Sequence, residues 1–232
     1  MCATALFAGC STHERAASTA ARVRPVPAAV PVTTTSSAPR VRVLPVPAAL
    51  TAPTVGLRDA PVPVPLTLQI PAIALNVAVL GVGMTSSNVM DAPEGGPDDP
   101  VWQQAFWYRG SAVPGATSTA LIAAHIDDPR GRPGAFAAID TLRRGDSIVV
   151  HDTRTGLDVR FAVTVVERYP VADWTNRAVL TRMYGAGPVT GTWPQRSPDG
   201  LAHLTLVTCA GTFRNSIGTH DERLAVYATR VA

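Results

Sequence analysis

Short apolar runs separated by turn residues dominate the chain from residue 66 onward. The runs are rich in β-branched residues, which is typical of strands. They predict about eight strands, at residues 65–70, 76–80, 107–108, 117–125, 147–150, 159–169, 204–209 and 223–228. Helical spacing appears only at residues 135–142 and 174–183, where we expect short helices. Many short strands with little helix predict an all-β barrel or sandwich.

Three segments between the predicted strands are expected to be irregular. Residues 84–104 read as a long loop with few core residues. Residues 127–131, Asp-Asp-Pro-Arg-Gly, form a turn. Residues 184–200 are rich in glycine and proline and are expected to form a loop.

The composition changes upstream of residue 66. Residues 22–65 contain ten of the 21 prolines, and Pro-Val-Pro-Ala-Ala occurs there twice. Alternating proline with valine or alanine favours extended polyproline II structure over a packed core. We therefore expect a proline-rich disordered linker at residues 22–65 and a folded domain at residues 66–232.

Residues 1–21 are interpreted as the remnant of an export signal. The stretch from Leu6 to Ser11 is similar to the lipobox of bacterial lipoproteins, in which the cysteine, here Cys10, is lipidated. No apolar stretch reaches the 18 residues needed to span a membrane. We expect an extracytoplasmic domain attached to the outer face of the cytoplasmic membrane by its N-terminus.

Charge and composition exclude some classes of function. Apolar residues make up 46% of the 232 residues, enough for a sizeable core, and the net charge is only +3. All basic residues are arginines, and they are scattered along the chain, so no nucleic-acid-binding patch is predicted.

Cys209 is the only cysteine outside the N-terminal segment, since the other two are Cys2 and Cys10. It ends an apolar strand at residues 204–209. An unpaired cysteine in an exported protein is a candidate reactive thiol, although a small buried side chain is the alternative. An imidazole and a guanidinium also mark strand ends, at His125 and Arg223.

His125 is the first choice for the base among the histidines. It ends an apolar strand at the start of a polar loop, whereas His203 lies about 20 Å from Cys209 along its own strand. His220, just before Arg223, is the alternative base. Asp127 either orients the His125 ring or caps the following turn.

The arginine and threonine near Cys209 leave alternatives open. Arg223 begins the strand after Cys209, and Arg214 follows Cys209 in a loop. Thr208 either packs in the core or binds the substrate backbone through its hydroxyl.

Together these groups suit acyl transfer through a thioester. An imidazole can take the thiol proton, and an arginine can stabilise the oxyanion. No His and Cys cluster with metal-ligand spacing is seen, so neither a metal nor another cofactor is expected.

Several motifs occur in the order found in sortases. Residues 205–209, Thr-Leu-Val-Thr-Cys, match the sortase signature Thr-Leu-x-Thr-Cys, and residues 123–127, Ala-Ala-His-Ile-Asp, are similar to the Gly-His-x-Asp region. The strand at residues 223–228, after Gly218, resembles the one that opens with the catalytic arginine. Phe136, Leu142 and Gly145-Asp146 also fit the family pattern.

The resemblance implies an eight-stranded sortase-type β-barrel and a cysteine transpeptidase. Such an enzyme cleaves a Leu-Pro-x-Thr-Gly-like sorting signal after threonine and transfers the protein to an amine of a peptidoglycan precursor or a pilin. Cys209 is then the nucleophile, His125 the acid and base, and Arg223 the substrate and oxyanion ligand.

The all-arginine, proline-rich composition and Cys-Ala-Gly are most similar to the actinobacterial class E and F sortases, and class F is favoured. Ala124 stands where the family usually has glycine. Asp221 stands where many class F members carry an arginine, and it shares a strand face with Arg223.

Two other functions remain open. An exported thiol peptidase would use the same chemistry with water as the acceptor. A non-enzymatic β-barrel lipoprotein would bury Cys209 as a core residue.

Overall fold

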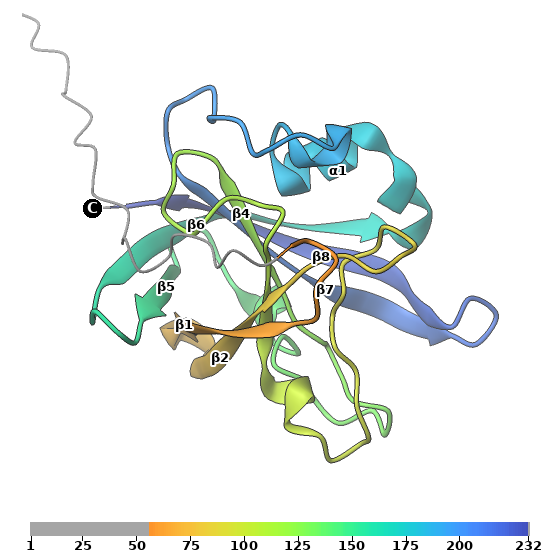
Figure 1. Ribbon diagram of the computed structural model, residues 1–232. Coiled ribbons are helices and arrows are strands. Elements are labelled where there is room, and N and C mark those ends of the chain that lie inside the picture. The colour runs from red at the N-terminus through yellow and green to blue at the C-terminus, as the bar shows by residue number, and fades with distance from the viewer. Residues whose placement is uncertain (1–55, 232) are drawn as a thin grey trace, which may run out of the picture. The chain divides into compact units, whose positions relative to one another are not determined.

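Eight strands close into a barrel in the order β1-β2-β3-β4-β7-β8-β6-β5, as the computed structural model of residues 56–231 describes (Figure 1). The predicted β-barrel is therefore confirmed. The strands are β1 (Val62–Ile70), β2 (Leu75–Val82), β3 (Ala105–Tyr108), β4 (Thr119–Ala123), β5 (Ser147–Asp152), β6 (Asp158–Pro170), β7 (His203–Arg214) and β8 (Thr219–Arg230).

Most neighbouring strands are antiparallel, but two pairs run parallel, β2 with β3 and β4 with β7. The register of β4 and β7 pairs Thr119 with His203 and continues to Ala123 with Val207. On its other edge β7 pairs with β8 in an antiparallel hairpin, in which Cys209 lies opposite Arg223. The residues that follow Ala123 and Val207 therefore lie at the same end of the barrel.

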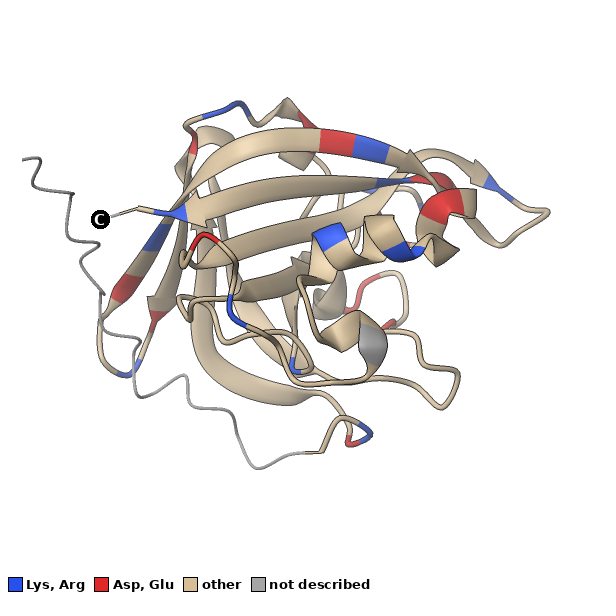
Figure 2. Ribbon diagram, turned by 90° about the horizontal axis from the view of Figure 1, so that it is seen from above, with Lys and Arg blue, Asp and Glu red and all other residues tan. Residues whose placement is uncertain are grey.

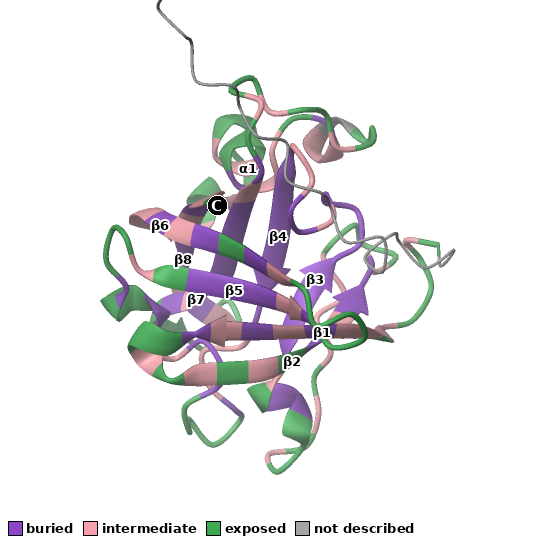
Figure 3. Cartoon of the chain, turned by 90° about the vertical axis from the view of Figure 1, so that its left-hand side faces the viewer, coloured by how far each residue is buried: buried purple, intermediate pink, exposed green. Residues whose placement is uncertain are grey.

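The core fills the inside of the barrel. Figure 3 shows β4 and most of β5 buried, whereas β1, β2 and β6 alternate buried residues with intermediate or exposed ones. Alternate residues of β7 and β8 point inward, including Leu204, Leu206, Leu224 and Val226, which are at most 2% exposed. This alternation is the two-residue period expected of strands with one face in the core.

A second apolar cluster lies on the outer face of the barrel. Helix α1 (Arg177–Tyr184) packs there through Met183, which is fully buried with Leu121, Val207 and Ala225. Arg182 of the same helix forms a 2.6 Å ion pair with a carboxylate of β6, Glu167. The helix therefore covers part of the surface that β4, β7 and β8 present (Figure 1).

The helix expected at residues 135–142 is not formed. Only a 3₁₀ turn at Ile139–Thr141 is present, although Phe136 and Leu142 are buried as expected. The amide of Phe136 donates to the carbonyl of His125. The backbone of this segment therefore bonds to the residues after β4 and does not form a helix.

The helix expected at residues 174–183 is divided in two. A 3₁₀ helix, Val171–Thr175, precedes α1, and Asn176 separates them. The Asn176 side chain accepts a hydrogen bond from the amide of Ala178. Asparagine is a favoured N-cap residue because it satisfies a free amide at the start of a helix.

The loop at residues 84–104 contributes more to the core than expected. A 3₁₀ helix, Pro100–Gln103, begins after Asp99, whose side chain caps the amide of Val101 at 2.9 Å. Val101 and Trp102 are each 7% exposed and pack with Phe106.

The predicted domain boundary at residue 66 falls inside β1. The barrel's hydrogen bonds begin earlier, since the amide of Met84 donates to the carbonyl of Leu57 at 2.7 Å. The predicted signal, Cys10 and most of the linker lie outside the described residues. Among residues 56–231, no helix is long and apolar enough to cross a membrane.

Candidate active site

The parallel register of β4 and β7 brings His125 and Cys209 to the same end of the barrel. Each residue follows the last paired residues of its strand, Ala123 and Val207, by two positions. The pairing extends one step further, because the amide of Ala124 donates to the carbonyl of Val207 at 3.2 Å.

Cys209 and Arg223 lie opposite each other on β7 and β8. Their neighbours Ala210 and Leu224 belong to the barrel core. Side chains alternate along a strand, so Cys209 and Arg223 belong to the outer face, together with Val207 and Ala225. The three predicted reactive residues therefore come from neighbouring strands at one end of the sheet.

The Cys209 side chain is half-buried and free of any disulfide. It lies at the edge of the apolar cluster covered by α1. A thiol in this position is held by a strand and remains partly open to solvent, as a nucleophile requires.

Aromatic rings and one carbonyl surround the His125 ring. The Trp102 ring centroid lies 4.5 Å away and that of Phe106 lies 5.4 Å away. Nε2 of His125 lies 2.9 Å from the carbonyl oxygen of Pro93. The ring is thus held from the long loop between β2 and β3 as well as from β4.

The guanidinium of Arg223 bonds to its own hairpin. Nη1 donates to the carbonyls of His220 and Glu222, both at 2.9 Å, and Nη2 donates to the hydroxyl of Thr219 at 3.1 Å. The guanidinium carbon lies 5.7 Å from the ring centroid of Trp174. These contacts hold the charge on the β7–β8 hairpin. Cys209 and Arg223 lie within these strands and not at their ends as predicted, because β7 continues to Arg214 and β8 begins at Thr219.

Thr208 points the other way, into the barrel. It is 3% exposed, and its hydroxyl donates to the carbonyl of Ala124 at 2.8 Å. Of the two roles predicted for this side chain, this placement favours packing between β4 and β7 over a contact with substrate.

The alternative base and the alternative arginine each form an ion pair with an aspartate. Nε2 of His220 pairs with Asp127 at 3.3 Å. The turn predicted for Asp127 to cap is instead capped by Asp128, which accepts from the amides of Arg130 and Arg132. Arg214 is exposed and pairs with Asp221 at 2.8 Å.

Trp102, Trp174 and Pro93 were missed as site residues in the sequence. The only signal for Trp102 and Pro93 was their place in an unusually long loop with the turn residues Gly95-Gly96-Pro97. Trp102 and Pro93 contact His125 although they lie 23 and 32 residues before it in the sequence. No local sequence pattern encodes such contacts.

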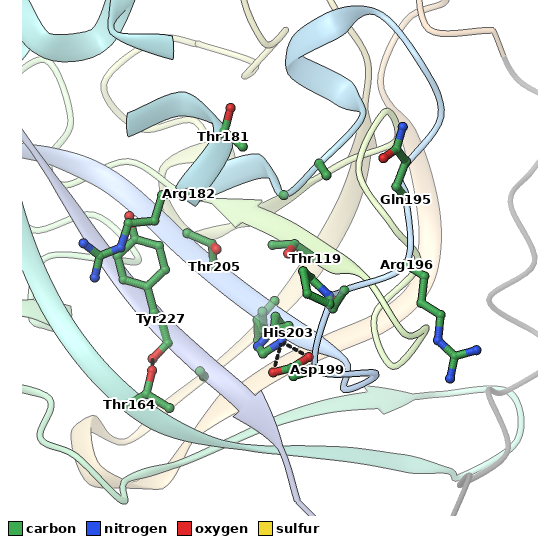
Figure 4. Close-up of a pocket in the computed structure, with 16 residues that line it drawn as sticks. Thr119, Thr164, Thr181, Arg182, Gln195, Arg196, Asp199, His203, Thr205 and Tyr227 are labelled. Atoms are coloured by element: carbon green, nitrogen blue, oxygen red, sulfur yellow. Dashed lines mark hydrogen bonds and ion pairs between the residues drawn. The ribbon is translucent and has the colours of Figure 1, made fainter. Parts of the chain in front are cut away.

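A pocket of about 460 Å³ lies beside α1 (Figure 4). It is lined by Thr205 and His203 of β7, and by Arg182, Tyr227 and Asp199. Thr205 precedes Cys209 by four residues on the same strand face. Cys209, His125 and Arg223 do not line this pocket.

Acidic and basic residues are interspersed along the ribbon in the view of Figure 2. Within residues 56–231, no group of three or more His, Cys, Asp or Glu side chains is placed to hold a metal ion. Burial raises the pKa of Tyr184, beside the pocket, to about 12.

A thiol, an imidazole and a guanidinium on neighbouring segments of the barrel suffice for acyl transfer. The thiol supplies the nucleophile, the imidazole moves protons, and the guanidinium stabilises negative charge on oxygen. The half-exposed edge leaves access for a peptide.

Comparison with known proteins identifies one family. The sortase domain model matches residues 68–231. No curated protein matches the chain.

Solved structures with a similar chain path are also sortases. Sortase A from Corynebacterium diphtheriae, a lid mutant, is 17% identical with a TM-score of 0.47, covering 73% of this chain and 71% of that chain. The lid mutant of sortase C1 from Streptococcus agalactiae is 16% identical with a TM-score of 0.46, covering 72% and 69%. Sortase C-1 from Actinomyces oris is 18% identical with a TM-score of 0.45, covering 72% and 71%.

Proposed function

Because the chain belongs to the sortase family of cysteine transpeptidases, we propose that Cys209, His125 and Arg223 carry its reaction. The observation that supports this assignment is the pairing of β7 with both β4 and β8, which brings Cys209 and Arg223 close to the end of β4, where His125 follows. No other cysteine lies within residues 56–231.

In the first half-reaction, the Cys209 thiolate attacks the carbonyl carbon of threonine in a Leu-Pro-x-Thr-Gly-like sorting signal. The guanidinium of Arg223 stabilises the oxyanion that forms. His125 then gives a proton to the departing glycine amine as the C–N bond breaks, leaving a thioester on Cys209.

In the second half-reaction, an amine of a peptidoglycan precursor or another acceptor attacks the thioester. His125 takes a proton from this amine, and the C–S bond breaks as the new amide forms. The protein that carried the sorting signal becomes joined to the acceptor, and Cys209 returns to its starting state.

The pocket beside α1 is our candidate binding site for the polypeptide upstream of the sorting signal. At about 3.3 Å per residue, the four residues from Cys209 to Thr205 span roughly 13 Å. An extended peptide anchored at Cys209 would therefore reach the pocket with residues four or more positions from the scissile bond.

The finer assignments follow from the sequence. We propose an enzyme of the actinobacterial class E and F groups, with class F favoured. We place the domain on the outer face of the cytoplasmic membrane, joined by a proline-rich linker to an N-terminal anchor at Cys10. Its partners would be proteins with a C-terminal sorting signal.

The test uses the chain with a Leu-Pro-x-Thr-Gly peptide, with and without an added amine, and follows the products by mass. We expect cleavage after threonine and an amine-linked product, both absent in Cys209→Ala. Arg223→Lys is expected to lower kcat/KM by about 100-fold, whereas Arg214→Lys, on the same hairpin, should leave it unchanged.

Other outcomes would point to the alternatives. Cleavage without an amine-linked product would indicate a thiol peptidase. A folded protein without cleavage or thioester, and with a thiol that resists alkylation, would indicate a β-barrel binding module.

A further inference from the structure

The contact between Pro93 and His125 fixes which ring nitrogen carries hydrogen. The carbonyl oxygen of Pro93 lies 2.9 Å from Nε2 of His125. A backbone carbonyl only accepts hydrogen bonds, so Nε2 must be the donor. In a neutral ring the lone pair then resides on Nδ1, which has no hydrogen-bond partner within residues 56–231.

The orientation of the ring is restricted on its other sides. Trp102 lies against it at an interplanar angle of 53°, and Phe106 meets it at 73°. Rotating the ring to exchange its nitrogens would require movement of these buried side chains, which are at most 7% exposed. The aromatic contacts therefore support the hydrogen bond in selecting one arrangement.

The loop that carries Pro93 is fastened to the loop that follows His125. We call residues 91–99 the Pro93 loop. Asp98 in this loop accepts hydrogen bonds from Arg130 at 2.8 and 3.0 Å and from Arg132 at 2.9 Å. These bonds hold the pKa of Asp98 below its ordinary value.

Two further bonds secure the same arrangement. The indole Nε1 of Trp102 donates to the carbonyl of Gly96, in the middle of the Pro93 loop, at 2.7 Å. Arg132 also donates to the carbonyl of Pro97. The Trp102 ring, which packs on His125, is thus bonded to the same loop as the Pro93 carbonyl, which accepts a hydrogen bond from His125.

We propose that Asp98 is a positioning residue, which holds the Pro93 loop against His125 and so makes Nδ1 the nitrogen that exchanges protons during catalysis. The proposal rests on the proposed function of His125. In each turnover, the Cys209 thiol proton passes to Nδ1 and then to the departing amine, and a proton of the incoming amine later passes to Nδ1.

Asp98 acts at a distance from the reaction and on the surface. Its side chain is 72% exposed, and exposed ion pairs contribute little to global stability and are screened by salt. Replacing Asp98 should therefore leave the barrel folded while loosening the Pro93 loop. An effect of Asp98 on the position of the His125 ring can therefore be measured apart from an effect on stability.

The first test does not depend on turnover. In the full chain labelled with ¹⁵N-histidine, the two ring nitrogens of neutral His125 are distinguished by their chemical shifts at alkaline pH, with His125→Gln identifying the signals. We expect hydrogen on Nε2 in the wild type and a mixture of tautomers in Asp98→Asn. Hydrogen on Nδ1 in the wild type would overturn the proposal even if the enzyme is a sortase.

The second test compares Asp98→Asn with Asp140→Asn. Asp140 is a matched control because it accepts a 2.9 Å hydrogen bond from a surface arginine, Arg168. With the peptide and amine used above, we expect about a tenfold loss of kcat in Asp98→Asn, because small displacements of a catalytic group are costly. KM should stay within about twofold, and Asp140→Asn should match the wild type.

Conservative changes complete the test. Asp98→Glu, which keeps the charge, should recover part of the lost kcat. Trp102→Phe keeps a ring beside His125 but loses the bond to Gly96, so it should broaden the tautomer mixture as Asp98→Asn does. Equal tautomer populations and kcat in Asp98→Asn and Asp140→Asn would contradict the proposal. An inactive wild type with the expected tautomer would instead count against the proposed function.

Discussion

The hydroxyl of Thr208 donates a 2.8 Å hydrogen bond to the carbonyl of Ala124, which lies 84 residues earlier in the chain. Each partner immediately precedes one of the residues assigned to the reaction, Cys209 and His125. The bond lies on the barrel side of the sheet, behind both. It therefore ties the backbone of the nucleophile to the backbone of the base.

Thr208→Val tests this tie. The change keeps the shape of the side chain but leaves the buried Ala124 carbonyl without its partner, which should lower the free energy of unfolding by about 1–3 kcal/mol. Thr205→Val, three residues away on the opposite face of β7 and also buried, is the control. Denaturant unfolding measures both, and equal stability losses would show that the bond contributes nothing specific.

Gly134→Ala should disturb the loop that holds His125. A Cβ at position 134 would lie 2.5 Å from the backbone carbonyl oxygen of His125, and a backbone atom cannot move aside cheaply. We expect destabilisation of about 1–3 kcal/mol and slower turnover of the peptide. Gly96→Ala provides the control, since a Cβ there meets nothing within 4 Å; similar effects of the two changes would refute the steric argument.

The two histidines near Cys209 should behave differently when replaced. His220 is 8% exposed and bonds Asp127, so His220→Gln should weaken a structural link and lower kcat by less than about tenfold. His125→Gln should lower it by at least about 100-fold, as expected for loss of the acid and base. The measurement is kcat for peptide turnover in each variant. A larger loss in His220→Gln than in His125→Gln would make His220 the base.

Alkaline pH should destabilise the barrel through its tyrosines. Burial raises the pKa of Tyr184 to about 12 and also raises those of Tyr108 and Tyr227. A pKa that is higher in the folded chain gives stability that is complete below pH 10 and lost as the pH rises toward 12. For Tyr184 alone the loss is about 3 kcal/mol.

Spectrophotometric titration measures this directly. The folded protein should show little tyrosinate absorbance near pH 10, whereas the protein in denaturant should titrate with an ordinary midpoint close to 10. Coincident titration curves for the two states would contradict the raised values.

The strands could be predicted because they are encoded locally. Runs of apolar and β-branched residues, such as residues 204–209 and 223–228, indicate strands without reference to the rest of the chain. The class of barrel followed from the number of such runs and from the family resemblance, and both are confirmed.

The helices and the surroundings of His125 depend on distant contacts. Residues 135–142 have helical spacing, yet the amide of Phe136 bonds the carbonyl of His125. Trp102 was assigned to a loop, yet it is buried against His125. The roles of Cys209, His125 and Arg223 stay predictions, and the sequence could not show that Asp127 would meet His220 from another strand.

The hairpin of β7 and β8 is the last part of the barrel to be synthesised, and it carries both Cys209 and Arg223. Strand β4 has no β7 to pair with until that hairpin has been synthesised. A growing chain therefore has its proposed base long before it has a nucleophile or an oxyanion ligand. Transpeptidation would begin only once the barrel has closed, so a chain that lacks the hairpin would form no thioester.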